Sequence, residues 1–118
     1  MLIGELSTRT GVSARLLRYY EQQGLLSSER TSAGYRVYGE DAVTQVRQIR
    51  SLLSAGLSTE TIGFVLPCTV GTGPDGLKFE LCPDLVRTLR DELAAQDAKL
   101  DELKRTRSTL AAYVAAGD

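Results

Sequence analysis

The last third of the chain carries an uninterrupted heptad pattern, and no other feature limits the fold as strongly. Its core positions recur at alternating spacings of three and four, and only Gln96 and Arg107 are polar. The apolar positions are Val86, Leu89, Leu93, Leu100, Leu103, Leu110 and Val114. The pattern predicts a coiled-coil helix over residues 83–118. A helix of about 33 residues is about 50 Å long and cannot fold back on so small a domain. We therefore expect its apolar positions to form the interface of a homodimer.

The chain begins with two short helical segments joined by a tight turn. Residues 3–10 are compatible with a helix, and Gly11 follows as a helix breaker. Ser13 is a suitable N-cap for a second helix over residues 14–23, and Gly24 is placed to end that helix. Two short helices joined by a three-residue turn that contains glycine are typical of a helix-turn-helix motif.

The segments that follow predict the rest of a small domain. Residues 25–38 combine turn-forming residues with the aromatic and β-branched run 35–38, which predicts a β-hairpin. Helical spacing returns over residues 41–55, and Ser58 caps a further short helix that Pro67 terminates. The predicted fold class is mainly α: a winged helix-turn-helix head with a small β-hairpin wing, plus a long C-terminal coiled-coil helix.

A stretch rich in glycine separates the head from the long helix. Residues 68–82 contain three glycines and an internal proline, a composition that predicts a loop. Pro83 suits the first position of the last helix, where its missing N–H costs nothing. The predicted organisation is a DNA-binding domain over 1–66, a linker or effector loop over 67–82 and a dimerisation helix over 83–118.

Charge and composition narrow the class of protein. Residues 1–55 hold seven arginines against five acidic residues, although the whole chain has a net charge of -1. Arginine suits bidentate contacts to phosphates and bases. No apolar run approaches the length of about 20 residues that a membrane span needs, and the start lacks the features of a signal peptide. We therefore expect a cytoplasmic protein without a membrane partner.

Several short motifs, taken together, resemble the mercury-resistance regulator (MerR) family. They are Ile3-Gly4-Glu5-Leu6, Gly11-Val12-Ser13, Leu17-Arg18-Tyr19-Tyr20-Glu21, Gly24-Leu25-Leu26, Gly34-Tyr35-Arg36-Val37-Tyr38 and Ala55-Gly56-Leu57-Ser58. The resemblance covers roughly residues 2–66, and the long helix matches in kind. It implies a dimer whose long helices pair antiparallel, with two winged heads on a pseudo-palindromic promoter. It also implies that the protein bends and untwists an overlong promoter spacer for RNA polymerase, an indirect readout of double-stranded DNA.

The second helix carries the residues expected to read DNA. Ser13 and Ala14 lie at its N-terminus, where a recognition helix usually meets base edges. Arg15 has the length and geometry to bind a guanine or a phosphate. The resemblance implies that Arg18 and Tyr19 contact the DNA backbone and nearby bases. The alternative is a solvated helix face with structural tyrosines.

The wing and the third helix add further candidates. The resemblance implies that Arg36 inserts toward phosphate and that Arg50 contacts the backbone. Tyr38 is assigned either a DNA contact or a role in anchoring the wing to the core. For Arg50 the alternative is an exposed charge that only aids solubility.

Two cysteines, Cys68 and Cys82, are the candidates for a chemical input. With Pro83 as the first helical residue, Cys82 is the N-cap, and its thiol faces the positive end of the helix dipole. Three interpretations follow: structural thiols, a redox switch, or sensing of a soft metal or electrophile. A disulfide between them would close a loop of about 14 residues. The four-cysteine cluster of the family's iron–sulfur sensors is missing, so no cofactor or metal is assigned.

Two other classes of function compete with the promoter-binding regulator. The first is an interaction or adaptor protein, dimerised by the coiled coil, whose head does not bind DNA. The arginines at positions 15, 18 and 36 argue against it. The second is a cysteine enzyme, and the chain has no histidine to serve as its base. We therefore expect no enzymatic activity.

Overall fold

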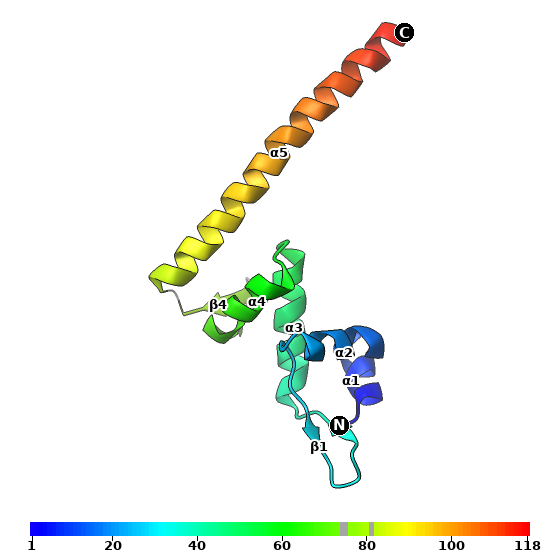
Figure 1. Ribbon diagram of the computed structural model, residues 1–118, viewed down its shortest axis with the longest axis vertical. Helices are drawn as coiled ribbons and strands as arrows, with labels where there is room; N and C mark the ends of the chain where they lie inside the picture. The colour runs from blue at the N-terminus through cyan, green and yellow to red at the C-terminus, as the bar shows by residue number, and fades with distance from the viewer. Residues whose placement is uncertain (74–75, 81) are drawn as a thin grey trace. The chain divides into compact units, whose positions relative to one another are not determined.

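The computed structural model describes residues 1–73, 76–80 and 82–118. The chain divides into two compact units, Met1–Glu80 and Leu81–Asp118. Figure 1 shows their elements: short helices and hairpins in the first unit and one long helix in the second. The fold is mainly α-helical, with a winged helix-turn-helix head and a long C-terminal helix, as the sequence predicts.

Two helices of the first unit begin at a serine that caps them, and the first helix ends at a glycine. The helices of this unit are α1 Ile3–Thr10, α2 Ala14–Gln22, α3 Asp41–Ser54 and α4 Thr59–Val65, followed by the 3-10 helix η1 Leu66–Cys68. The Ser13 hydroxyl caps α2 by accepting a hydrogen bond from the Leu16 N–H at 3.2 Å. Ser58 caps α4 in the same way with the Thr61 N–H. Gly11 ends α1 with a φ of 73°, a conformation that glycine adopts without steric cost.

The core of this unit forms where α1, α2, α3 and α4 meet. Helix α3 supplies one complete apolar face, buried at the spacing of an amphipathic helix. The buried side chains are Leu6, Val12, Leu17, Tyr20, Leu25, Leu26, Tyr38, Ala42, Val43, Val46, Ile49, Leu52, Leu57, Ile62 and Val65. Because α2 contributes Leu17 and Tyr20 to this core, its opposite side is left exposed.

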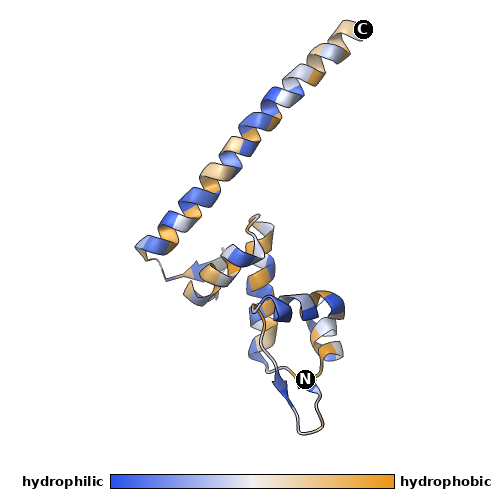
Figure 2. Ribbon diagram, viewed as in Figure 1, coloured by the Kyte–Doolittle hydropathy of each residue, from blue (hydrophilic) through white to orange (hydrophobic). Residues whose placement is uncertain are grey.

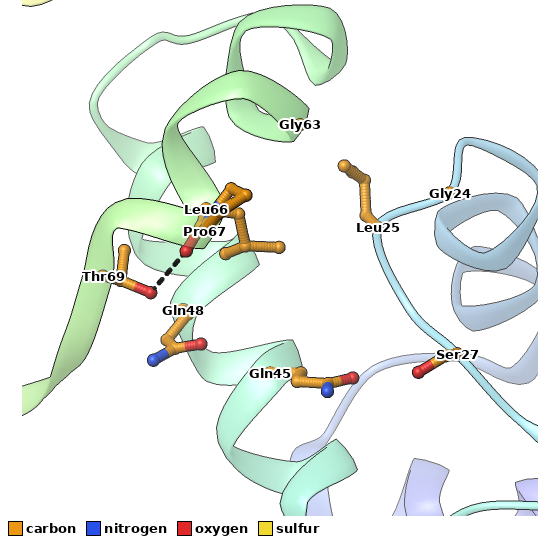
Figure 3. A pocket seen from close by; sticks show the side chains of 9 residues that line it. All are labelled: Gly24, Leu25, Ser27, Gln45, Gln48, Gly63, Leu66, Pro67 and Thr69. Carbon is orange, nitrogen blue, oxygen red and sulfur yellow. Dashed lines mark hydrogen bonds between the residues drawn. The ribbon is translucent and has the colours of Figure 1, made fainter. Parts of the chain in front are cut away.

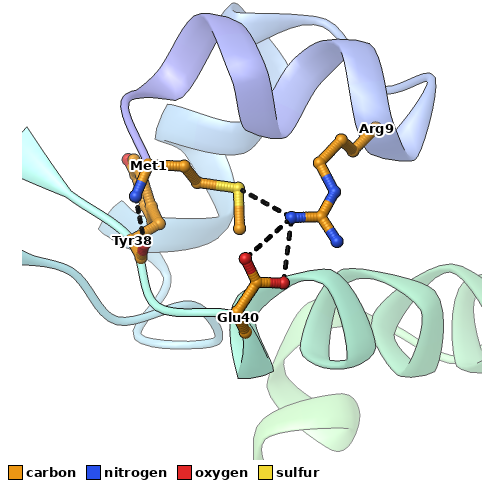
Figure 4. A network of polar contacts seen from close by, with 4 residues as sticks. All are labelled: Met1, Arg9, Tyr38 and Glu40. Atoms are coloured by element: carbon orange, nitrogen blue, oxygen red, sulfur yellow. Dashed lines mark hydrogen bonds and ion pairs between the residues drawn. The ribbon is translucent and has the colours of Figure 1, made fainter.

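The predicted wing is a small antiparallel hairpin of β1 Glu29–Arg30 and β2 Arg36–Val37. Its base is tied to the start of the chain, as Figure 4 shows. The Met1 amine donates to the Tyr38 carbonyl at 2.7 Å, and the Tyr38 N–H donates back to the Met1 carbonyl at 2.7 Å. Beside them Arg9 on α1 forms an ion pair with Glu40 at 2.9 Å.

The prediction that residues 67–82 form a loop without secondary structure is wrong. A second antiparallel hairpin, β3 Thr69–Gly73 and β4 Gly76–Phe79, follows η1. Its glycines occupy paired positions, with Gly71 opposite Lys78 and Gly73 opposite Gly76. Both strands contact α3. These tertiary contacts stabilise strands that the glycine-rich composition alone disfavours.

The second unit consists of α5 Pro83–Gly117, a helix of 35 residues. Pro83 is its first residue and Cys82 its N-cap, as the sequence predicts. Figure 2 shows hydrophobic and hydrophilic residues alternating along it. The predicted interface residues Leu93, Leu100, Leu103, Leu110 and Val114 are exposed in the single chain, Leu103 by 64%. Val86 and Leu89 are half-buried. No helix in the described part of the chain is long and apolar enough to cross a membrane.

Candidate nucleic-acid interface

The predicted recognition residues lie on the side of α2 that faces away from the core. Arg15 and Arg18 are exposed, and Tyr19 is 42% exposed. Ala14 is half-buried at the first position of the helix. Ser13 is exposed, and its hydroxyl oxygen is already engaged as the helix cap. The helix-turn-helix therefore presents two cations and one aromatic ring on a single helix of the head.

A groove between α2 and the wing brings three arginines together. It has a volume of about 460 Å³. Its lining residues are Leu2, Ile3, Arg18, Arg30, Gly34, Tyr35 and Arg36. We call it the arginine groove. Arg18 comes from α2, Arg30 from β1 and Arg36 from β2. Positive charge from three separate elements around one concave surface suits a polyanion.

Arg30 is a member of this groove that the sequence did not reveal. It pairs directly with Arg36 across the hairpin, so the two side chains leave the same face of the wing. Its Nη1 donates to the Gly34 carbonyl at 3.0 Å, which holds the guanidinium against the tip of the hairpin. The register of the hairpin is the signal that identifies it. The sequence predicts the hairpin but not which residues pair.

Arg36 is held by an acidic residue of α2. Its Nη1 lies 3.3 Å from Glu21 Oε2, and the two side chains are 38% and 19% exposed. Glu21 also accepts hydrogen bonds from the Ser28 hydroxyl and, at 3.4 Å, from the Tyr38 hydroxyl. In the sequence Glu21 stands only as part of a motif and has no role of its own. One carboxylate therefore joins the last turn of α2 to three residues at or beside the wing.

Tyr38 lies in the core of the head and not on its exposed surface. Only 1% of it is exposed, so the expected contact with DNA is corrected in favour of anchoring. Burial raises the pKa of its hydroxyl, and the nearby Glu21 carboxylate adds to the rise, against smaller opposing effects of Arg36 and Arg18. The physical reason for the burial is its place directly after β2, at the base of the hairpin, where its backbone bonds with Met1 bring the chain back to the helices.

Arg50 and a second hollow lie outside the arginine groove. Arg50 is exposed on α3 and is not among the residues that line the groove.

The second hollow, shown in Figure 3, has a volume of about 380 Å³. It is lined by Gly24, Leu25, Ser27, Gln45, Gln48, Gly63, Leu66, Pro67 and Thr69. None of these lining residues is charged.

The two cysteines occupy different environments. Cys82 is exposed, and its sulfur accepts a hydrogen bond from the Leu85 N–H at 3.4 Å. Cys68 is half-buried at the end of η1. No disulfide joins these two described residues. In the part of the chain that the structure describes, no group of three or more His, Cys, Asp or Glu side chains could hold a metal ion. The described residues of one chain therefore do not fit a metal centre.

Comparison with known proteins places these features in context. Residues 1–67 match the family described as MerR HTH family regulatory protein. The regulator HmrR of Rhizobium leguminosarum bv. viciae is 32% identical over 90% of this chain and 80% of its own length. The nodulation protein NolA of Bradyrhizobium elkanii is 49% identical over 51% of this chain. The chain spans only 28% of that NolA sequence, so much of this relative has no counterpart here.

Solved structures share the fold. The regulator PbrR691 of Ralstonia metallidurans CH34, in complex with lead(II), aligns with a TM-score of 0.74 at 24% identity. That alignment covers 93% of this chain and 82% of the other. HiNmlR, a regulator that lacks the sensor domain and is bound to promoter DNA, aligns with a TM-score of 0.56 at 21% identity. It covers 97% of this chain and 86% of the other. Both likenesses concern the fold alone.

Proposed function

The chain belongs to the MerR family of helix-turn-helix regulatory proteins, and from that premise we propose that it regulates transcription by binding promoter DNA as a homodimer. The observation that carries the proposal is the arginine groove, which lies beside the exposed face of α2. It offers three guanidinium groups to phosphate, and α2 offers Arg15 to a base edge. We propose that the protein is cytoplasmic, because it would bind promoter DNA in that compartment.

Each residue of the interface has a distinct role in this proposal. Ala14 and Arg15, at the start of the recognition helix, carry most of the sequence preference, and Ser13 approaches the same bases. Arg18, Arg30 and Arg36 grip phosphates without regard to sequence. Tyr19 and Arg50 add contacts to the DNA backbone from α2 and α3.

The homodimer is the second part of the proposal. The exposed apolar residues of α5 support it, because burying one leucine stabilises a protein by about 1.5–3 kcal/mol. Antiparallel pairing of two such helices would place one winged head at each end of a pseudo-palindromic site. The division into a DNA-binding domain over 1–66, a connecting segment over 67–82 and a dimerisation helix over 83–118 belongs to the same proposal. The dimer distorts the promoter spacer so that RNA polymerase meets aligned recognition elements.

Selection of bound DNA from a random duplex pool tests the proposal. We expect enrichment of a sequence with two-fold symmetry, which would report the site and the dimer together. A gel shift on unselected duplex at low salt separates this function from that of an adaptor. An adaptor would leave the duplex unshifted at protein concentrations where a regulator of this class binds it, about 10⁻⁶ to 10⁻⁴ M for non-specific DNA. That result would reject the proposal.

A thiol input at the cysteines is a second, narrower proposal. The exposed sulfur of Cys82 supports it, since an accessible thiol at a helix N-terminus is the more readily oxidised kind. A peroxide would oxidise the Cys82 thiol to a sulfenic acid, and the Cys68 thiol would then displace water from it to form a disulfide. The proposed input is thiol oxidation, and soft metals form a separate arm of the test.

The test uses two serine variants, Cys68→Ser and Cys82→Ser, in a promoter assay. Promoter output is measured with and without diamide, and separately with soft-metal salts. We expect wild type to respond to diamide and both variants to lose that response. If wild type responds to neither reagent, or the variants respond as wild type does, the cysteines are structural. A response to metal salts alone would replace oxidation with metal sensing across the dimer.

A further inference from the structure

Three side chains at or beside the wing converge on one carboxylate of the recognition helix. The Ser28 hydroxyl donates to Glu21 Oε1, and the Tyr38 hydroxyl donates to Oε2 at 3.4 Å. The Arg36 guanidinium pairs with Oε2 at 3.3 Å. Ser28 precedes β1, Arg36 lies in β2, and Tyr38 follows β2. Glu21 therefore contacts both sides of the hairpin from a single position on α2.

The other hydrogen bonds described for the wing lie within the hairpin or join its base to Met1. Its strands pair at only two positions, Glu29 with Val37 and Arg30 with Arg36. A two-stranded hairpin of this kind is marginally stable by itself. Tyr38 anchors the base of the wing in the core, but Arg36 lies farther out and is 38% exposed. The contact that holds the Arg36 side chain is the ion pair with Glu21.

An acidic side chain beside a phosphate-binding groove is unfavourable by itself, because it repels the ligand. Glu21 is 19% exposed and is surrounded by three donors, which offset much of its charge. We propose that Glu21 is a positioning residue that orients Arg36 and the wing relative to the recognition helix before DNA binds. This inference rests on the proposed function. Its benefit is preorganisation, because a wing that is already ordered loses less entropy on binding.

The variant Glu21→Gln tests the inference because glutamine keeps the size and an oxygen acceptor but loses the charge. We expect it to weaken binding to unselected duplex DNA by about 10-fold, the effect of losing one charge-assisted hydrogen bond. In an Arg36→Ala background the same change should cost less than about 3-fold, because the coupled partner is gone. Glu40→Gln is the matched control, since Glu40 pairs with Arg9 on α1 and not with the wing.

Several outcomes would overturn the inference. Tighter or unchanged binding by Glu21→Gln would mean that the carboxylate acts only by repelling phosphate, or not at all. An equal loss in the wild-type and Arg36→Ala backgrounds would mean that Glu21 acts on stability and not through Arg36. The same loss in Glu40→Gln would show a general effect of charge.

Hydrogen exchange of the wing amides provides a readout that needs no DNA. We expect residues 29–38 to exchange severalfold faster in Glu21→Gln than in wild type or Glu40→Gln. Equal exchange would refute the positioning role even if DNA binding changed. If wild type binds no duplex, the proposed function fails while this measurement still decides the role of Glu21. If Glu21→Gln does not fold, Arg36→Met breaks the ion pair from the other side and should loosen the same amides.

Discussion

The sulfur of Cys82 accepts a hydrogen bond from the backbone N–H of Leu85 at 3.4 Å and thereby caps the first turn of α5. A serine hydroxyl can take over this hydrogen bond, whereas alanine cannot. We expect Cys82→Ala to lower the free energy of unfolding by at most about 1 kcal/mol, because sulfur accepts more weakly than the oxygen caps for which that cost is typical, and Cys82→Ser to preserve or raise it. Denaturant unfolding followed by circular dichroism measures both. Equal stability of the alanine and serine variants would mean that the cap contributes nothing.

The proposed dimer predicts a sharp response to charge on the apolar side of α5. Leu93 and Leu100 are 59% and 52% exposed in the single chain, and the double change to aspartate should give monomers. Each leucine removed from an interface costs about 1.5–3 kcal/mol before the added charges are counted. Analytical ultracentrifugation measures the mass in solution. The matched control is the double variant Ala95→Asp and Ala98→Asp, which adds the same charge outside the apolar core positions of the heptad repeat. A double leucine variant that still sediments as a dimer would refute the interface.

Removing an arginine from the arginine groove should weaken binding to DNA phosphates without changing the preferred DNA sequence. We expect Arg30→Ala and Arg36→Ala each to weaken operator and non-operator binding alike. For every phosphate that the variant no longer neutralises, the slope of log affinity against log salt should fall by about 0.9. Fluorescence anisotropy over a salt series measures the slope, and Arg105→Ala on α5 is the control for net charge. A changed sequence preference with an unchanged slope would assign these residues to base reading instead.

The raised pKa of Tyr38 predicts a loss of stability at alkaline pH. Burial favours the neutral hydroxyl, so the folded protein holds this proton above the ordinary tyrosine pKa of about 10. Its contribution is complete below that pH and is lost as pH rises through the folded pKa. We expect the free energy of unfolding of the Tyr38→Phe variant to fall less steeply as the pH rises. The variant should also lack one late step in the ultraviolet titration of tyrosinate. An unchanged titration would show that Tyr38 ionises like an exposed tyrosine.

Local chemistry in the sequence predicts the helices of this protein closely. Ser13, Ser58 and Pro83 mark the starts of α2, α4 and α5, because capping and the missing proline N–H act within one turn. The ends of α2 and α3 each fall one residue before the predicted end, Gln22 instead of Gln23 and Ser54 instead of Ala55. Such differences are ordinary at helix termini, which fray.

Interactions between distant segments account for what the sequence did not reveal. The β3–β4 hairpin depends on packing against α3, which the glycine content of the segment conceals. The role of Glu21 depends on Ser28, Arg36 and Tyr38, residues 7 to 17 positions away that reach it only once the wing is folded. The sequence is compatible with two roles for Tyr38, a DNA contact or an anchor of the wing. Its burial in the structure decides between them.

Because β3 and β4 form a hairpin, the number of residues between Cys68 and Glu80 does not determine where the chain leaves the first unit. The Glu80 N–H donates to the Cys68 carbonyl at 2.8 Å, so the two ends of the hairpin lie side by side. Residues inserted between β3 and β4 would extend the hairpin without moving Glu80 away from Cys68. A peptide tag inserted there is therefore expected to leave thermal unfolding of the chain unchanged. The site is a point of entry for reporters that follow the protein on DNA.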